Sequence, residues 1–292
     1  MFDIMIIGQI TLDHNIDFDG REEFRTGGAV TFSGYAAAAM GSRVAVVPKG
    51  DDRRVDPFAT FADSQVAQIF PVYSPTCTEM ENTYFTADRE RRRCLSTQMI
   101  VPYTPADLPE EGARIYHLGG LVRGDMGGDL IEACAKRGDA ALDVQAMLRC
   151  RNEDGTLELR DWPEKRQYLP FIRYLKTDAA EAEVLTGTDD REKAARMLCA
   201  WGAKEVLITH NTEALVCDGE RIYRSPLKPR NLSGRTGRGD TTFAGYLSER
   251  LRSDIPAALE WAAALVSLKM ETPGPFMGTR QDVTDYIERF YR

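Results

Sequence analysis

Short hydrophobic segments alternate with amphipathic ones along most of the chain. The apolar runs predict strands at 3–8, 43–48, 67–72, 114–118, 140–144, 172–176 and 205–209. Apolar residues at helical spacing predict helices at 30–40, 125–136, 181–185, 191–201, 241–252, 255–271 and 281–290. Strands that alternate with helices build βαβ units with right-handed crossovers, so the pattern predicts an α/β fold with a largely parallel sheet.

Two segments break this alternation. Residues 15–25 contain a turn at Asp19-Gly20, and residues 78–98 have the pattern of a β-hairpin. Both predict a small antiparallel flap that stands off the main sheet. No repeat, low-complexity tract or linker interrupts the sequence. We therefore expect a single domain over residues 1–292, with a β-sheet lid formed by about 14–26 and 77–99.

Composition and charge exclude several classes of protein. The formal net charge of −8 argues against a nucleic-acid partner, which requires a basic surface. No run of about 18 apolar residues exists, so no membrane span is expected. The N-terminus "MFDIMIIGQITLD" has the pattern of a first strand rather than a signal peptide. The 6 cysteines are scattered without a C-x-x-C pair, which favours reduced thiols and a cytoplasmic location.

One basic run allows two interpretations. Arg89, Arg91, Arg92 and Arg93 lie within "DRERRRC", between two strand-like segments. The run is typical of a solvated hairpin tip, and the alternative is that one of these arginines faces a phosphate group.

Polar residues follow several predicted strands, at the edge where parallel sheets bind ligands. They are Asp13 after the first strand, Asp143 and Gln145 after the fifth, Asp178 and Glu181 after the sixth, and Thr209 at the end of the seventh. Asp143 and Gln145 either reach a substrate or form a buried network at the strand end. Asp178 and Glu181 are three residues apart, so a helical turn carries both on one face; the plain alternative is a solvated helix start.

The stretch "SGRTGRGDTTFAGYLSERL" places glycines and a carboxylate at a helix entrance. Apolar residues at helical spacing begin at Phe243, so the helix is expected to start just after Gly239. Free amides and the positive end of the helix dipole favour an anion at this position. Asp240 either caps the helix or acts as a base beside the anion. The spacing matches neither a P-loop nor a dinucleotide-binding fingerprint.

This stretch resembles the signature D-T-T-G-A-G-D-x-F of the ribokinase-like (PfkB) carbohydrate kinases. Three other segments are similar to motifs of that family: "IIGQITLD", "TGGAVTFSGYAAAAMGSRVAVV" and "LKTDAAEAEVLTG". "VLITHNTEALVCDG" resembles its nucleotide-side strand. The resemblance covers nearly the whole chain. It implies a three-layer αβα sandwich with a mostly parallel central sheet and a small β-sheet lid over the substrate.

The resemblance also implies ATP-dependent phosphorylation of a hydroxyl group with Mg²⁺. Asp240 is then the general base, and the amides of Gly237, Arg238 and Gly239 hold the transferring phosphoryl group. The resemblance places Asp13, Gly27 and Gly28 in the acceptor site, and with Phe32 and the strand-end residues Asp143 and Gln145 they make up the acceptor site that we expect. Thr209 and Thr236, with Gly237 and Gly239, bind the nucleotide, and Asp178 and Glu181 orient magnesium through water.

The sequence departs from the family pattern at several positions. Gly234 replaces the first Asp of the signature, Arg238 replaces its Ala, and Phe32 replaces an Asn that often contacts the sugar. Asp178 replaces another Asn, and His210-Asn211 displaces a glycine. Arg238 either neutralises phosphate charge or is an exposed arginine.

These departures leave the acceptor open among a sugar, a polyol or cyclitol, and a nucleoside. The alternatives are a sugar phosphate held by the Arg89–Arg93 run and a sugar- or nucleotide-binding regulator with weak catalysis. A homodimer through the lid is a further expectation.

Overall fold

The main sheet has nine strands in the order β17-β16-β15-β14-β11-β10-β1-β4-β6. The computed structural model describes residues 1–86 and 91–292. The strands of this sheet are β1 (Phe2–Ile7), β4 (Val44–Val47), β6 (Gln68–Ile69), β10 (Ala113–Leu118), β11 (Asp139–Asp143), β14 (Ile172–Asp178), β15 (Glu205–Thr209), β16 (Glu213–Cys217) and β17 (Ile222–Pro226). Only β16 and β17 run antiparallel to their neighbours; the other strands pair in parallel.

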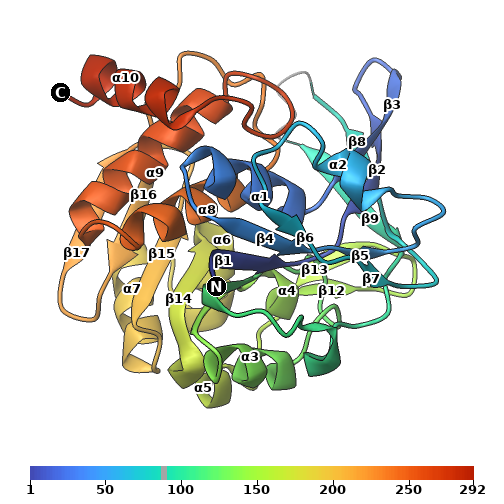
Figure 1. Cartoon of the computed structure of the whole chain (residues 1–292), viewed down its shortest axis with the longest axis horizontal. Helices are drawn as coiled ribbons and strands as arrows, with labels where there is room; N and C mark the ends of the chain where they lie inside the picture. Colours follow the sequence, from blue (N-terminus) through green and yellow to red (C-terminus); the bar gives the residue numbers. More distant parts are fainter. Residues whose placement is uncertain (87–90) are drawn as a thin grey trace.

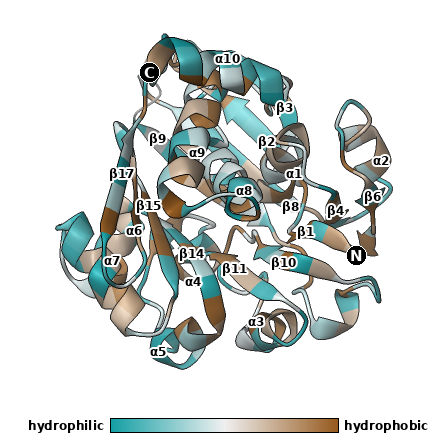
Figure 2. Cartoon of the chain, turned by 60° about the vertical axis from the view of Figure 1, so that its left-hand side comes forward, coloured by the Kyte–Doolittle hydropathy of each residue, from teal (hydrophilic) through white to brown (hydrophobic). Residues whose placement is uncertain are grey.

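Helices cover both faces of this sheet (Figures 1 and 2). They are α1 (Ala29–Ala39), α2 (Pro57–Thr60), α3 (Gly128–Ala135), α4 (Gln145–Leu148), α5 (Lys165–Tyr168), α6 (Ala179–Thr186), α7 (Arg191–Ala200), α8 (Arg238–Arg250), α9 (Ile255–Lys269) and α10 (Arg280–Phe290). Residues of α1, α8, α9 and α10 contribute to one buried hydrophobic cluster, and residues of α3, α6 and α7 contribute to another.

Strand β1 shows how the sequence produces the two layers. Its side chains alternate, so Ile4 and Ile6 join the first cluster while Met5 and Ile7 join the second. All four are fully buried, as a central parallel strand requires. The predicted three-layer αβα sandwich is therefore confirmed.

A separate four-stranded sheet, which we call the lid, stands beside the main sheet (Figure 1). Its order is β3-β2-β8-β9, with β2 (Thr11–Ile16), β3 (Glu22–Gly27), β8 (Thr78–Tyr84) and β9 (Arg92–Gln98). The sequence predicted an antiparallel lid, and this is correct within each hairpin. The two hairpins, however, meet through a parallel pairing of β2 with β8. The two hairpins lie side by side and point the same way, and this sets the parallel pairing.

Four short strands complete the structure. They are β5 (Lys49–Gly50) with β7 (Val72–Tyr73), and β12 (Arg149–Arg151) with β13 (Leu157–Leu159). The strand predicted at 67–72 is divided between β6 and β7, since Pro71 lacks the amide that a continuous ladder needs. Among the described residues, no helix is long and apolar enough to cross a membrane.

Candidate active site

Helix α8 begins at Arg238, two residues earlier than a start after Gly239 would allow. Gly237 precedes it with φ of 77°, a left-handed conformation that favours glycine, and its carbonyl accepts the first helical hydrogen bond from the Thr241 amide at 2.9 Å. A Cβ at Gly237 would lie 2.2 Å from the ring of Phe32. Both backbone conformation and space therefore require glycine at this position.

Residues 234–240, which are the turn before α8 and the first residues of that helix, form what we call the anion loop. The Arg238 amide donates to the Arg235 carbonyl at 3.2 Å. The next two amides, of Gly239 and Asp240, donate to none of the described residues. Unsatisfied amides at a helix N-terminus, with the positive end of the helix dipole, favour an anion.

Asp240 lies in the first turn of α8, and its backbone carbonyl accepts a 3.3 Å hydrogen bond from the Ser33 hydroxyl of α1. Burial raises the pKa of its carboxyl to about 6, and the charge of Asp143 adds to this effect. Lys176, Lys269 and Arg149 oppose it. None of the described residues donates a hydrogen bond to this carboxylate, so it does not act as a conventional helix cap.

Lys176 is a buried cation at the end of β14. Its ammonium group donates to both carboxylate oxygens of Asp143, at 2.9 and 3.1 Å, and lies 3.9 Å from Glu181 Oε2. Burial alone would lower the pKa of Lys176, but Asp143 and Glu181 reverse the effect and raise it. A Cβ at Gly239 would lie 3.1 Å from this ammonium group, so the glycine lets the anion loop approach it.

Asp178 and Glu181 form a reciprocal cap at the start of α6. Asp178 accepts the Glu181 amide and Glu181 accepts the Asp178 amide, both at 2.8 Å. Glu181 is only 2% exposed, so this is not the solvated helix start that was the plain alternative. Burial raises the pKa of Glu181 to about 7, against the lowering effect of Lys176. Thr209, the last residue of β15, pairs with Asp178 in the sheet.

Lys269 supports the anion loop from below. This buried ammonium group at the end of α9 donates to the Gly234 carbonyl at 2.6 Å and to the Thr236 carbonyl. Burial lowers the pKa of Lys269 to about 8, against the raising effect of Asp240. It also lies 5.2 Å from the centre of the Phe32 ring. Phe32 thus packs beneath the loop, between Gly237 and Lys269.

Asp13 and the two glycines before α1 form the opposite end of the site. A Cβ at Gly27 would lie 2.5 Å from Asp13 Oδ2, and one at Gly28 would lie 2.2 Å from the Gln9 carbonyl. Gly28 has φ of 98° and caps α1. Any side chain at Gly27 would clash with the Asp13 carboxylate, and any side chain at Gly28 would clash with the Gln9 carbonyl, so both positions require glycine.

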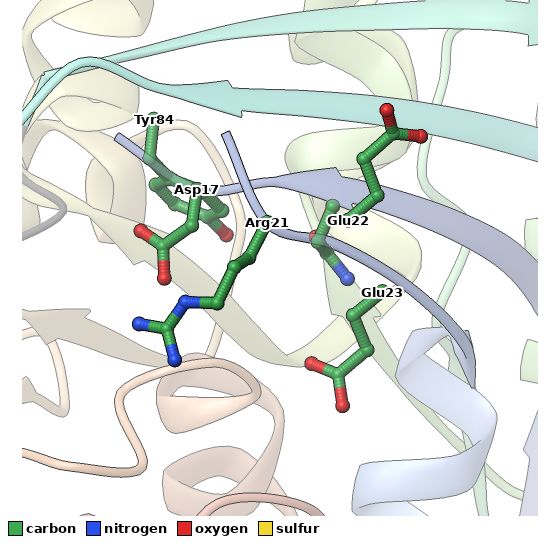
Figure 3. Close-up of a pocket in the computed structure, with 6 residues that line it drawn as sticks. Asp17, Arg21, Glu22, Glu23 and Tyr84 are labelled. Atoms are coloured by element: carbon green, nitrogen blue, oxygen red, sulfur yellow. The ribbon is translucent and has the colours of Figure 1, made fainter. Parts of the chain in front are cut away.

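The lid carries a cavity of about 320 Å³. It is lined by Asn15, Asp17, Arg21, Glu22, Glu23 and Tyr84. Figure 3 shows the side chains of Asp17, Arg21 and Glu23 directed to one side of the lid strands and that of Glu22 to the other. Strand alternation places Asn15 on the same face of β2 as Asp13, and Asn82 of β8 donates to Asn15 at 3.2 Å.

The structure brings most of the predicted residues to one edge of the main sheet and separates a few. Asp143 and Gln145 form a strand-end network, because Asp143 holds Lys176 and the Gln145 side chain accepts Arg149 at 2.8 Å. Arg238 donates to Asn211 at 2.7 Å. Arg91 and Arg93 are exposed near the lid tip, and Arg89 lies outside the described residues.

A family model for the pfkB family carbohydrate kinases matches residues 78–278, which include the anion loop, Lys176 and Glu181. The chain belongs to the pfkB family of carbohydrate kinases. Among curated relatives of this kinase, the cytidine kinase of Thermococcus kodakarensis is 26% identical over 258 residues, or 85% of this chain and 88% of the relative.

Solved structures of other kinases extend the comparison to the whole chain. A pyrophosphate-dependent kinase in the ribokinase family, complexed with a pyrophosphate analog and myo-inositol, is 32% identical with a TM-score of 0.88. The match covers 97% of this chain and 99% of that one. The ribokinase of Arabidopsis thaliana, complexed with ribose and ATP, has a TM-score of 0.75 at 16% identity over 98% and 99% of the chains, a likeness that shows the fold alone.

The sequence reasoning missed two cations of this kinase site, Lys176 and Lys269. Lys176 lies in the buried run "YLKT" of β14, between the charged residues Arg173 and Asp178, and Lys269 is the lone charge in "AAALVSLK" of α9. A buried lysine requires a partner, so a charge in such a run was the available signal.

Proposed function

We propose that this protein transfers a phosphoryl group from a phosphoanhydride donor to a hydroxyl group of a neutral ring polyol. The acceptor class comprises a sugar, a cyclitol or the ribose of a nucleoside. Family membership supports the reaction type. The relatives named for cytidine and myo-inositol support the acceptor class, since both compounds are neutral polyhydroxylated molecules.

The placement of Asp240 carries the proposal. Its carboxylate lies within the first turn of α8, beside amides suited to an anion, and accepts no hydrogen bond from the described residues. A base with a pKa of about 6 is ionised at neutral pH and still has appreciable proton affinity. A protein that only binds sugars has no need of such a group, so the geometry favours catalysis over a regulator.

The reaction follows from these positions. Asp13 accepts hydrogen bonds from acceptor hydroxyls, and Asp240 removes the proton from the hydroxyl that attacks. The acceptor oxygen forms a bond to phosphorus while the bridging P–O bond breaks and its electron pair leaves with the departing phosphate. The Gly239 and Asp240 amides stabilise the equatorial phosphoryl oxygens, and Lys176 keeps the neighbouring carboxylates compensated.

The acidic pair fits magnesium only through water. Glu181 Oε2 accepts the Asp178 amide and lies 3.9 Å from the Lys176 ammonium group, which disfavours a metal ion bound directly at this oxygen. Glu181 Oε1 accepts no hydrogen bond from the described residues, and it is the atom suited to a magnesium-bound water. When bound, Mg²⁺ supplies charge neutralisation between the donor phosphates.

The donor class includes ATP, as the sequence implies, and pyrophosphate, which similar structures use. The test is a matrix of these donors against myo-inositol, ribose, cytidine and ribose 5-phosphate, with products identified by ³¹P NMR. We expect transfer to at least one neutral acceptor and weaker transfer to the sugar phosphate. A preference for the sugar phosphate that is lost in Arg91→Ala or Arg93→Ala would move the acceptor anchor to the lid tip.

Ligand binding without turnover across the whole matrix would favour the regulator instead. The homodimer through the lid stays a prediction. The mass in solution, measured by light scattering, tests it, and a monomer at micromolar concentration would contradict it.

A further inference from the structure

We propose that Arg238, held by Asn211, selects inorganic pyrophosphate over ATP as the phosphoryl donor. The inference rests on the proposed function, because it concerns the donor end of the same site. It makes Arg238 a specificity-determining residue at the position where the family signature has a small alanine.

Arg238 spans the donor end of the site. It is the first residue of α8, so its backbone belongs to the turn that presents the Gly239 and Asp240 amides. Its guanidinium group donates to Asn211 Oδ1 at 2.7 Å. Asn211 lies in the turn between β15 and β16, directly after Thr209 and His210. The side chain therefore bridges the anion loop and the nucleotide side of the sheet.

The charge of Arg238 matches the distal phosphate of bound pyrophosphate better than the β-phosphate of bound ATP. The distal group of pyrophosphate is a terminal phosphate, with about 1.5 to 2 negative charges at neutral pH, like other monosubstituted phosphates. The β-phosphate of ATP is bonded on both sides and carries about one. A guanidinium fork binds a terminal phosphate through parallel hydrogen bonds, which is the geometry that arginine favours.

Further contacts tie together the elements around Asn211, on the nucleotide side of the site. The Leu227 amide donates to the Thr212 carbonyl at 2.8 Å, which joins β17 to the same turn as Asn211. The Lys228 amide donates to Ser267 of α9 at 2.9 Å, and the Gly234 amide donates to the Met270 carbonyl at 2.7 Å.

Arg230 forms a two-pronged ion pair with Glu271, and Tyr286 donates to the same carboxylate at 2.8 Å. A Cβ at Gly234 would lie 1.8 Å from the Thr272 carbonyl, so these two backbones touch. The segment at 226–236 is thus fastened to α9 and α10 along its length. A base could enter between this segment and α9 or α10 only if these contacts broke, whereas pyrophosphate has no base to admit.

With pyrophosphate the transfer is balanced. The acceptor oxygen bonds to one phosphorus atom, the bridging P–O bond breaks, and its electron pair leaves on orthophosphate beside Arg238. The proton of the acceptor hydroxyl passes to Asp240 and then to solvent or to the orthophosphate. The products are one phosphate ester and one orthophosphate, and no nucleotide is consumed.

The experiment compares the intact wild-type protein with Arg238→Ala and with the matched control Arg235→Ala, which removes the same charge from the same loop. We measure kcat/KM for pyrophosphate and for ATP with each neutral acceptor that turns over. We also titrate imidodiphosphate and the imido analogue of ATP by calorimetry with Mg²⁺. Arg238→Lys keeps the positive charge and removes the two-pronged hydrogen bonding of the guanidinium group. It provides a second test in case the alanine variant does not fold.

We expect the wild type to prefer pyrophosphate, and Arg238→Ala to lower its kcat/KM for pyrophosphate about 10- to 100-fold, as loss of a charged hydrogen-bonding group implies. Its kcat/KM for ATP should change by less than about threefold, and Arg235→Ala should not alter the ratio between donors. A wild-type preference for ATP would overturn the inference, and so would an equal loss with both donors in Arg238→Ala.

The binding measurement separates this inference from the proposed function. If no acceptor is phosphorylated but imidodiphosphate still binds more tightly than the ATP analogue in an Arg238-dependent manner, the proposed function fails and the donor assignment stands. If turnover occurs and imidodiphosphate binds no better than the ATP analogue, the donor assignment fails alone.

Discussion

The two ends of the candidate site differ in how deeply their residues are buried. The phosphate end rests on the core of the main sheet, where Asp143, Lys176, Glu181 and Lys269 are each at most 5% exposed. The acceptor end is a thin lid whose Phe24 is 75% exposed, and Phe18 and Phe85, beside its turns, are more than half exposed. The phosphate end is therefore a packed network of charges, and the acceptor end is a surface sheet.

This contrast indicates that the buried phosphate end determines the reaction and that the exposed lid determines which acceptor binds. In the buried network Lys176 is compensated by Asp143 and Glu181, so removing one of these charges leaves its partner uncompensated at a cost of several kcal/mol. A lid strand presents every second side chain to the acceptor, and those side chains can change without disturbing the core. The reaction is therefore easier to infer from the sequence than the substrate is.

The largest expected effect lies at the phosphate end. Asp240→Asn keeps the size of the side chain and removes the proton acceptor, so kcat should fall by roughly 10²- to 10⁴-fold. Donor affinity, measured by calorimetry, should change little. A kcat near that of the wild type would remove Asp240 from the proposed mechanism.

The pH dependence gives an independent reading of the same group. Because the pKa of Asp240 is about 6, wild-type kcat/KM should fall as the pH drops through 6, and the residual activity of Asp240→Asn should lack this limb. The folded protein binds this proton more tightly than the unfolded chain, whose aspartates titrate near about 3.9. The contribution of Asp240 to the free energy of unfolding is therefore lost as the pH rises from about 4 to 6. Asp240→Asn should consequently melt at a higher temperature than the wild type at pH 8.

A smaller effect is expected at the acceptor end. Asp13→Ala should raise KM for the acceptor at least about tenfold while KM for the donor stays nearly constant, because a charge-assisted hydrogen bond contributes about 1.5–3 kcal/mol. Glu81→Ala is the matched control, since it removes a lid carboxylate from the face that carries His14. Equal shifts in the two variants would assign the effect to lid stability instead.

Local patterns in the sequence predicted seven of the nine strands of the main sheet, all but β16 and β17, together with both lid hairpins and the anion loop. Helix spacing, strand alternation and glycine positions are local signals. They did not predict the parallel pairing of β2 with β8, whose partners Thr11 and Thr78 are far apart in the chain. The partners of Lys176 and Lys269 were not predicted either, because Asp143 and the Gly234 carbonyl are distant in sequence from these lysines and contact them only in the folded protein. Phe32, which we placed among the acceptor residues, packs against Gly237, a contact that no spacing rule encodes.

The smallest effect is expected at Glu181 of the phosphate end, where a substitution tests whether the buried carboxylate helps to bind Mg²⁺. Glu181→Gln keeps the reciprocal cap, because the glutamine oxygen still accepts the Asp178 amide. The variant removes the negative charge that attracts a magnesium-bound water, so the Mg²⁺ concentration for half-maximal rate should rise while kcat at saturating Mg²⁺ falls only modestly.

Asp178→Asn tests the other member of the acidic pair, since it preserves the cap from the other side and leaves Glu181 charged. A smaller rise of the Mg²⁺ requirement in this variant than in Glu181→Gln would assign the larger role to Glu181. An unchanged Mg²⁺ profile in Glu181→Gln, with a melting temperature that shifts, would assign Glu181 to the start of α6 and to the compensation of Lys176. A raised Mg²⁺ requirement in Glu181→Gln alone would show that a residue almost fully buried in the core still acts on the donor. Buried charges at the phosphate end would then serve catalysis as well as stability.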